Sequence, residues 1–179
     1  YSLNANTTGS HNTGYGYSAL IGNTTGVGNT AIGWRSLRAN TVGNYNVASG
    51  YQSLTANTTG DFNTGSGYRS LHATSTGDYN TALGGYAGDV ITTGDNNVIL
   101  GYGTDPSAVD GSNQIVIGFG TTGKGDNTVT IGNGDITAWS ASDDGEVDLG
   151  SSSVEFKDLY VDGVAYTDAI GFGSVAMTL

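Results

Sequence analysis

The sequence contains no cysteine, a single proline and no long apolar run, and each absence excludes a class of protein. Without cysteine the chain can form neither a disulfide framework nor a thiolate metal site. Pro106 is the only proline, which excludes collagen, because collagen needs abundant proline and glycine at every third position. No stretch approaches the roughly 20 apolar residues of a membrane span, so we expect no membrane insertion.

Charge is also scarce, and it is unevenly distributed. The chain has 5 Lys and Arg against 16 Asp and Glu, and its formal net charge of −11 at pH 7 argues against nucleic acid as a partner. Residues 1–60 contain no Asp or Glu, and every acid follows from Asp61 onward. The basic-leaning part contains Arg35, Arg38 and Arg69. These arginines could form a solvated face or contact an anionic glycan, and both interpretations stay open.

Catalytic residue combinations are missing as well. His11 and His72 are the only histidines, and no Ser-His-Asp or His-cluster spacing accompanies them. The aspartates recur with the repeat, whereas acid–base chemistry needs carboxylates in unlike environments. We therefore expect no enzyme and no cofactor.

What the sequence has in abundance is glycine, 31 of 179 residues, placed with a constant period of 17. The first column comprises Gly9, Gly26, Gly43, Gly60, Gly77, Gly94 and Gly111. The second column comprises Gly16, Gly33, Gly50, Gly67, Gly84, Gly101 and Gly118. We expect each glycine to mark a corner that needs a positive φ or a close backbone approach.

Other columns follow the same period. Aromatic residues come directly after the second glycine: Tyr17, Trp34, Tyr51, Tyr68, Tyr102 and Phe119. Leucine follows three residues later in the first coils: Leu20, Leu37, Leu54 and Leu71. Asparagine precedes short segments that we predict to be strands, such as 30–32 and 98–100: Asn12, Asn29, Asn46, Asn63, Asn80 and Asn97. No window has a helical periodicity of useful length.

These columns predict an all-β solenoid of stacked 17-residue coils over residues 1–132, followed by a small β region over 133–179. Equivalent residues of neighbouring coils should lie about 4.8 Å apart, so that asparagines pair with asparagines and aromatics stack on aromatics. A coil offers few apolar side chains, so we expect a homotrimer in which three coils share an axial core.

Several segments resemble known families. The segments NNVILG (96–101), NQIVIG (113–118) and NTVTIG (127–132) resemble the repeats of trimeric autotransporter adhesin heads, and the longer repeat is similar to repeats in adhesin-like proteins and phage tail fibres. The phrase LGSSSVEFKDLYVDG (149–163) is similar to a segment frequent in phage tail-fibre proteins. The resemblance implies a left-handed parallel β-roll in a trimeric, extracellular tail fibre of the virion. It also implies other fibre or baseplate proteins and a host-surface glycan or protein as partners.

Two columns are candidate sites. Tyr45, Phe62 and Tyr79 form an aromatic loop column that could contact a receptor or pack coil on coil. Asp61, Asp78 and Asp95 form a carboxylate column that could bind Ca²⁺, although a capping role at a coil corner is the favoured interpretation.

Two alternatives to a tail fibre stay open. One is the head of a bacterial trimeric autotransporter adhesin at the cell surface. The other is a monomeric ice-binding solenoid that uses threonine columns, in which Thr24 and Thr58 would be required.

Overall fold

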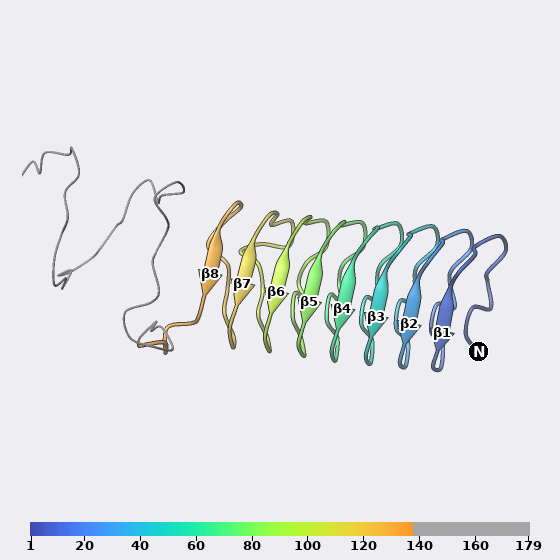
Figure 1. Ribbon diagram of the computed structural model, residues 1–179, viewed down its shortest axis with the longest axis horizontal. Helices are drawn as coiled ribbons and strands as arrows, with labels where there is room; N and C mark the ends of the chain where they lie inside the picture. Colours follow the sequence, from blue (N-terminus) through green and yellow to red (C-terminus); the bar gives the residue numbers. More distant parts are fainter. Residues whose placement is uncertain (138–179) are drawn as a thin grey trace, which may run out of the picture. The chain divides into compact units, whose positions relative to one another are not determined.

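The computed structural model describes residues 1–137, which form a stack of parallel β-coils (Figure 1). Each coil contributes one three-residue strand, and the strands form one 8-stranded parallel sheet in chain order. They are β1 (Thr13–Tyr15), β2 (Thr30–Ile32), β3 (Val47–Ser49), β4 (Thr64–Ser66), β5 (Thr81–Leu83), β6 (Val98–Leu100), β7 (Ile115–Ile117) and β8 (Val129–Ile131). The predicted β-solenoid is thus confirmed for these residues, which include no helix.

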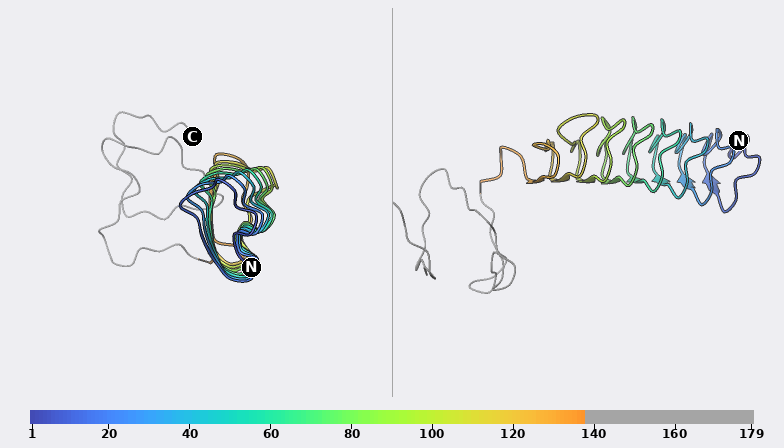
Figure 2. Two further views of the ribbon diagram at one scale, coloured as in Figure 1. Left: turned by 90° about the vertical axis from the view of Figure 1, so that its right-hand side faces the viewer. Right: turned by 90° about the horizontal axis from the view of Figure 1, so that it is seen from above.

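Successive strands pair with a constant step. Thr30 lies opposite Val47, a separation of 17 residues, and the same step joins the strands up to β7. The last step is shorter, because Ile115 pairs with Val129. Figure 2 shows the coils superposed when viewed along the stack. The predicted β region of 133–179 lies outside the described residues, apart from 133–137.

The interior of the stack is filled by side chains of the same chain. The middle residue of most strands is buried, and so are the leucines of the column found in the sequence. These buried apolar residues include Ala31, Ala48, Ala82, Ile99 and Val116 from the strands and Leu20, Leu37, Leu54 and Leu71 from the turns. In the first coils, small strand residues and turn leucines share this interior.

A ladder of asparagines precedes the strands, and we call it the strand-side Asn ladder (Asn12, Asn29, Asn46, Asn63, Asn80 and Asn97). All of them except Asn12 are buried. The Asn29 side-chain oxygen accepts the backbone N–H of Asn46 at 2.9 Å. The Asn29 Nδ2 donates to the carbonyl of Gly43 at 2.8 Å. The same two bonds recur from coil to coil, so each buried amide satisfies backbone groups that no strand partner reaches.

A second ladder, the turn-side Asn ladder, comprises Asn6, Asn23, Asn40 and Asn57. From Asn23 onward, each Nδ2 donates to the side-chain oxygen one coil earlier, for example Asn40 to Asn23 at 2.7 Å. The ladder ends where Thr74 replaces asparagine, and the Asn57 Oδ1 and Thr74 Oγ1 atoms are buried without a hydrogen-bond partner. The prediction that asparagines satisfy one another along the stack is confirmed.

The two glycine columns serve the two purposes that the sequence predicted. Gly33 adopts a φ of 126°, a conformation that other residues rarely reach. Gly43 has no positive φ, but a Cβ there would overlap the carbonyl oxygen of Gly60 and the side chain of Asn40. A Cβ on Gly33 would also overlap the carbonyl oxygen of Gly50, so both columns allow the coils to approach closely and the second column also forms the corners.

Left-handed backbone also occurs at positions that are not glycine. Leu37 has a φ of 48°, Arg35 of 56° and Tyr45 of 55°, and the equivalent residues of neighbouring coils repeat these values. Such a conformation costs about 1–2 kcal/mol per residue. It persists because the neighbouring coils fix the same turn above and below each residue.

Candidate functional surfaces

The outward side of the sheet is formed by the first and last residue of every strand, and we call it the outward sheet face. Its members are Thr13, Tyr15, Thr30, Ile32, Val47, Ser49, Thr64, Ser66, Thr81, Leu83, Val98, Leu100, Ile115, Ile117, Val129 and Ile131. None of them is charged, although the chain has a net charge of −11. A surface that excludes charge over eight strands is suited to contact with another uncharged surface.

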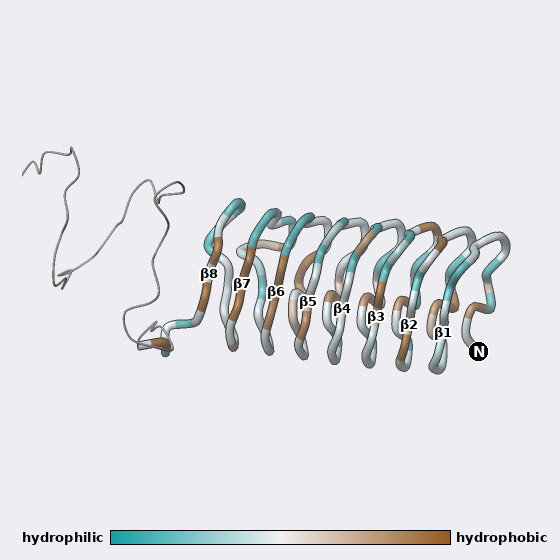
Figure 3. Tube along the Cα trace, viewed as in Figure 1, coloured by the Kyte–Doolittle hydropathy of each residue, from teal (hydrophilic) through white to brown (hydrophobic). Residues whose placement is uncertain are grey.

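The outward sheet face becomes more apolar toward the end of the stack. Each of β1 to β5 carries at least one outward Thr or Ser, and β4 carries two, whereas every outward residue of β6, β7 and β8 is Val, Ile or Leu. Figure 3 shows this hydrophobic stretch along the three strands. Val98, Leu100, Val129 and Ile131 are exposed there, so a contiguous apolar patch faces the solvent.

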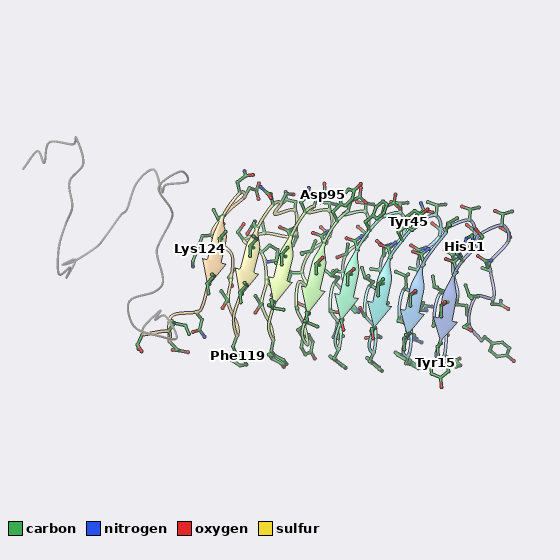
Figure 4. The ribbon with its side chains drawn as sticks, in the orientation of Figure 1. His11, Tyr15, Tyr45, Asp95, Phe119 and Lys124 are labelled. Carbon is green, nitrogen blue, oxygen red and sulfur yellow. The ribbon has the colours of Figure 1, made fainter. Side chains whose placement is uncertain are left out.

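The predicted receptor-contact residues form a stack at one edge of the coils, near the position of Tyr45 in Figure 4. The ring centroids of Tyr45 and Phe62 are 5.0 Å apart and those of Phe62 and Tyr79 are 5.3 Å apart, with nearly parallel planes. The Tyr45 ring also lies over Gly28. Both faces of Phe62 are therefore covered, and the stack presents ring edges rather than open ring faces to a ligand.

The aspartate column lies beside this stack and binds backbone N–H groups. The Oδ1 atom of Asp78 accepts the N–H of Asp61 at 2.7 Å, and Asp95 accepts the N–H of Asp78 at 2.7 Å. The Asp61 Oδ1 accepts the N–H of Asn44. The column thus caps the backbone from one coil to the next rather than within one turn. Among residues 1–137, no three His, Asp or Glu side chains group to hold a metal ion.

A second aromatic column runs along the opposite edge and carries a cation. Trp34 stacks on Tyr51 at 4.7 Å, and Tyr51 stacks on Tyr68 at 5.2 Å. The guanidinium carbon of Arg35 lies 4.1 Å from the centroid of the Trp34 ring. Such a cation–π contact orients the guanidinium against the ring.

The next coils carry titratable groups close to Arg69. Burial lowers the pKa of His72, Arg69 lowers it further, and Asp89 opposes the change. Burial raises the pKa of Asp89, and Arg69 and His72 oppose that change. Burial also raises the pKa of Asp105 to about 6, and the nearby Asp89 adds to the effect. The charge of Asp105 therefore responds to mildly acidic pH.

Comparison with known protein families, with curated proteins and with solved structures finds no match for this chain. The described residues also contain no helix that is long and apolar enough to cross a membrane. Functional arguments for this chain therefore rest on its own residues.

Sequence reasoning found the glycine, leucine and asparagine columns but did not identify the outward sheet face. A signal was available, because charged residues are missing from the first and last positions of every predicted strand. Three-residue strands hide it, since they are too short for a visible alternation.

Proposed function

We propose that this chain is a non-enzymatic structural and adhesive part of a viral tail fibre, with left-handed coils and three copies associated through their outward sheet faces. The observation that supports this proposal is the uncharged outward sheet face, which ends in the apolar residues of β6, β7 and β8. Exposed patches of this kind are typical of protein–protein contacts.

Charge favours a second copy of the chain as the occupant of this face. Two copies each carry a net charge of −11, so the uncharged face is where a second copy can approach with the least repulsion between like charges. The rows of one face repeat about every 4.8 Å, so an identical face presents matching rows. Because each coil fills its own interior, association covers the outward face and needs no shared core.

Attachment would follow from repetition. A trimer presents every column three times, and several weak contacts made together bind far more tightly than one. The partners would be other fibre or baseplate proteins of the virion and a glycan or protein of the host surface. This setting rests on the resemblance of 149–163 to tail-fibre segments and of the repeats to adhesin heads.

A bacterial trimeric adhesin head would use the same association, and a membrane anchor in the full-length gene would identify it. The ice-binding alternative is weakened at the residues that it needs. The hydroxyl of Thr24 donates to the carbonyl of Thr41 at 2.9 Å, and that of Thr58 donates to Ser75 at 3.0 Å. Thermal hysteresis from the isolated chain would nevertheless favour it.

The test is the native mass of the chain by light scattering, with a matched pair of variants. Val98 lies on the outward sheet face and Val42 on a turn, and their exposed fractions are 41% and 44%. We expect the wild type and V42E to be trimers, and V98E to dissociate because it places like charges in the contact. A folded wild-type monomer, or equal behaviour of the two variants, would overturn the proposal.

A further inference from the structure

The three arginines of the chain are gathered on one side of the first coils. Arg35 and Arg69 occupy one column. The backbone N–H of each donates to the carbonyl of an equivalent tyrosine one coil earlier, Tyr17 and Tyr51 respectively, at 2.9 Å. They are two coil-to-coil steps apart, with one coil between them, which corresponds to about 10 Å along the stack. Arg38 and His72 follow three residues later in the two coils. We call these four residues the basic strip.

The first half of the basic strip, Arg35 and Arg38, lies where the chain has no acid. Residues 1–60 contain neither Asp nor Glu, so nothing in these coils neutralises Arg35 or Arg38. The intervening coil carries the neutral Gln52 and Thr55 in the two columns. The strip ends at Asp89, the residue that follows His72 by one coil. A positive segment therefore stands out on an acidic chain.

The side chains of Arg35 and Arg69 are oriented before any ligand arrives. The guanidinium of Arg35 rests on the Trp34 ring. The Nε atoms of Arg35 and Arg69 are buried without a hydrogen-bond partner. With Nε turned inward, the terminal nitrogens of Arg35 form a planar fork that suits a carboxylate or a sulfate. One terminal nitrogen of Arg69 lies 3.4 Å from His72 Nδ1, and its other terminal nitrogen makes no side-chain hydrogen bond within residues 1–137. The adjacent stack of Trp34, Tyr51 and Tyr68 adds a rigid apolar surface.

We propose that the basic strip binds a linear anionic polysaccharide, with Arg35 and Arg69 engaging acidic groups of the polymer two coils apart. A polymer fits better than a small anion because the cations are spread along the stack. Nucleic acid fits less well, because its charge density, one per about 1.7 Å in a duplex, far exceeds that of three arginines spread over about 10 Å, and the excess charge would face the aspartates beyond residue 60. This proposal names the class of glycan that the proposed host attachment would involve. It rests on that proposed function for its biological setting only.

The repeat itself supplies a conservative variant. Gln52 and Thr55 occupy the two columns in the intervening coil, and Gln52 has a φ of 55°, close to the 56° of Arg35. R35Q/R38T therefore gives one coil the residues of its neighbour at these positions and should leave the fold intact. K124Q is the control for net charge, because Lys124 lies near β8 at the far end of the stack (Figure 4).

The experiment measures binding of the full chain to polygalacturonate, with neutral dextran and a single-stranded oligonucleotide as comparison ligands. We expect wild type and K124Q to bind polygalacturonate alike, and R35Q/R38T to bind it at least roughly tenfold more weakly. Binding should weaken as salt is added, because exposed charges are screened. R35K/R38K should recover only part of the affinity, because lysine lacks the planar fork.

Several outcomes would overturn the proposal: no binding by the wild type, equal losses in K124Q and R35Q/R38T, equal binding of dextran, or tighter binding of the oligonucleotide. The strip lies within one chain, so its failure is separable from failure of the trimer. V98E should still bind a short oligogalacturonate with the wild-type affinity per chain. A trimer that does not bind the polymer would contradict only this inference. A monomer that binds the polymer would contradict only the proposed association of three chains.

Discussion

The coils before residue 85 and the coils after it fill the same interior with different residues. In the earlier coils a turn leucine, such as Leu54 or Leu71, faces a small strand residue such as Ala82. In the later coils Gly88 replaces the leucine, and the strand residue becomes Ile99. A Cβ on Gly88 would lie 3.0 Å from Leu71 and 3.1 Å from Ile91. The volume has moved from the turn to the strand, so the coil keeps its width.

The polar framework changes less than the apolar filling. The strand-side Asn ladder crosses both regions and ends at Gln114, whose N–H donates to the Asn97 Oδ1 at 3.0 Å. The turn-side ladder belongs to the earlier coils and gives way to Thr74 and then to the buried Ile91. The comparison indicates that the strand-side ladder and the glycine corners define the coil, whereas the core residues are interchangeable in pairs.

The largest effect should come from breaking the feature that both regions share. In N63A, the N–H of Asn80 and the carbonyl of Gly77 lose their partners inside the stack. Two buried orphan groups cost about 2–6 kcal/mol together. N97A should cost the same, because the Asn97 side chain makes the equivalent bonds to Gln114 and Gly111. Urea unfolding measures both losses.

The exposed T59A is the control for this pair, with an expected change within about 0.5 kcal/mol. A clear inequality between N63A and N97A would show that the ladder stabilises one region more than the other, and the idea of a common framework would then be wrong.

A smaller effect should follow from giving the later coils the leucine of the earlier ones. G88L places a side chain against Leu71, Ile91 and Ile99, and such overpacking costs about 1–3 kcal/mol. The leucine column tolerates the backbone, since Leu71 has a φ of 49° and Gly88 of 61°. I99A restores the small strand residue, so G88L/I99A should recover most of the loss. The double-mutant cycle measures this coupling, and additive losses would contradict the exchange of volume.

The columns that could be predicted from the sequence are those in which one residue type has one characteristic structural role. Glycine at a fixed period indicates corners, and asparagine at a fixed period indicates amide pairing, so both were predicted correctly. The left-handed Leu37 and Tyr45 could not be predicted, because neither residue favours that conformation and the neighbouring coils impose it. Asp78 was interpreted as a cap within a corner, whereas its bond joins two coils, a distinction that needs coordinates.

The two regions differ in charge as much as in filling. The earlier coils carry arginine over an aromatic stack, and the later coils carry half-buried carboxylates at positions equivalent to leucine or arginine. Asp105 succeeds Gly88 in the former leucine column, and Asp89 succeeds His72 in the column of Arg38. The later coils should therefore show the stronger dependence of stability on pH.

The smallest expected effect is D105N, which removes the charge from that column. Burial and Asp89 raise the pKa of Asp105 from 3.8 to about 6, and the N–H groups of Val90 and Asp89 offset only part of this. Between these pH values the folded chain holds a proton that the unfolded chain releases, so the wild type loses stability as the pH rises through the window. Asparagine carries no charge at any pH and keeps an oxygen to accept the same N–H groups. The melting temperature of D105N should therefore match the wild type near pH 4 and exceed it at pH 7.5. An equal shift at both pH values would mean that the substitution acts through packing rather than through the buried charge.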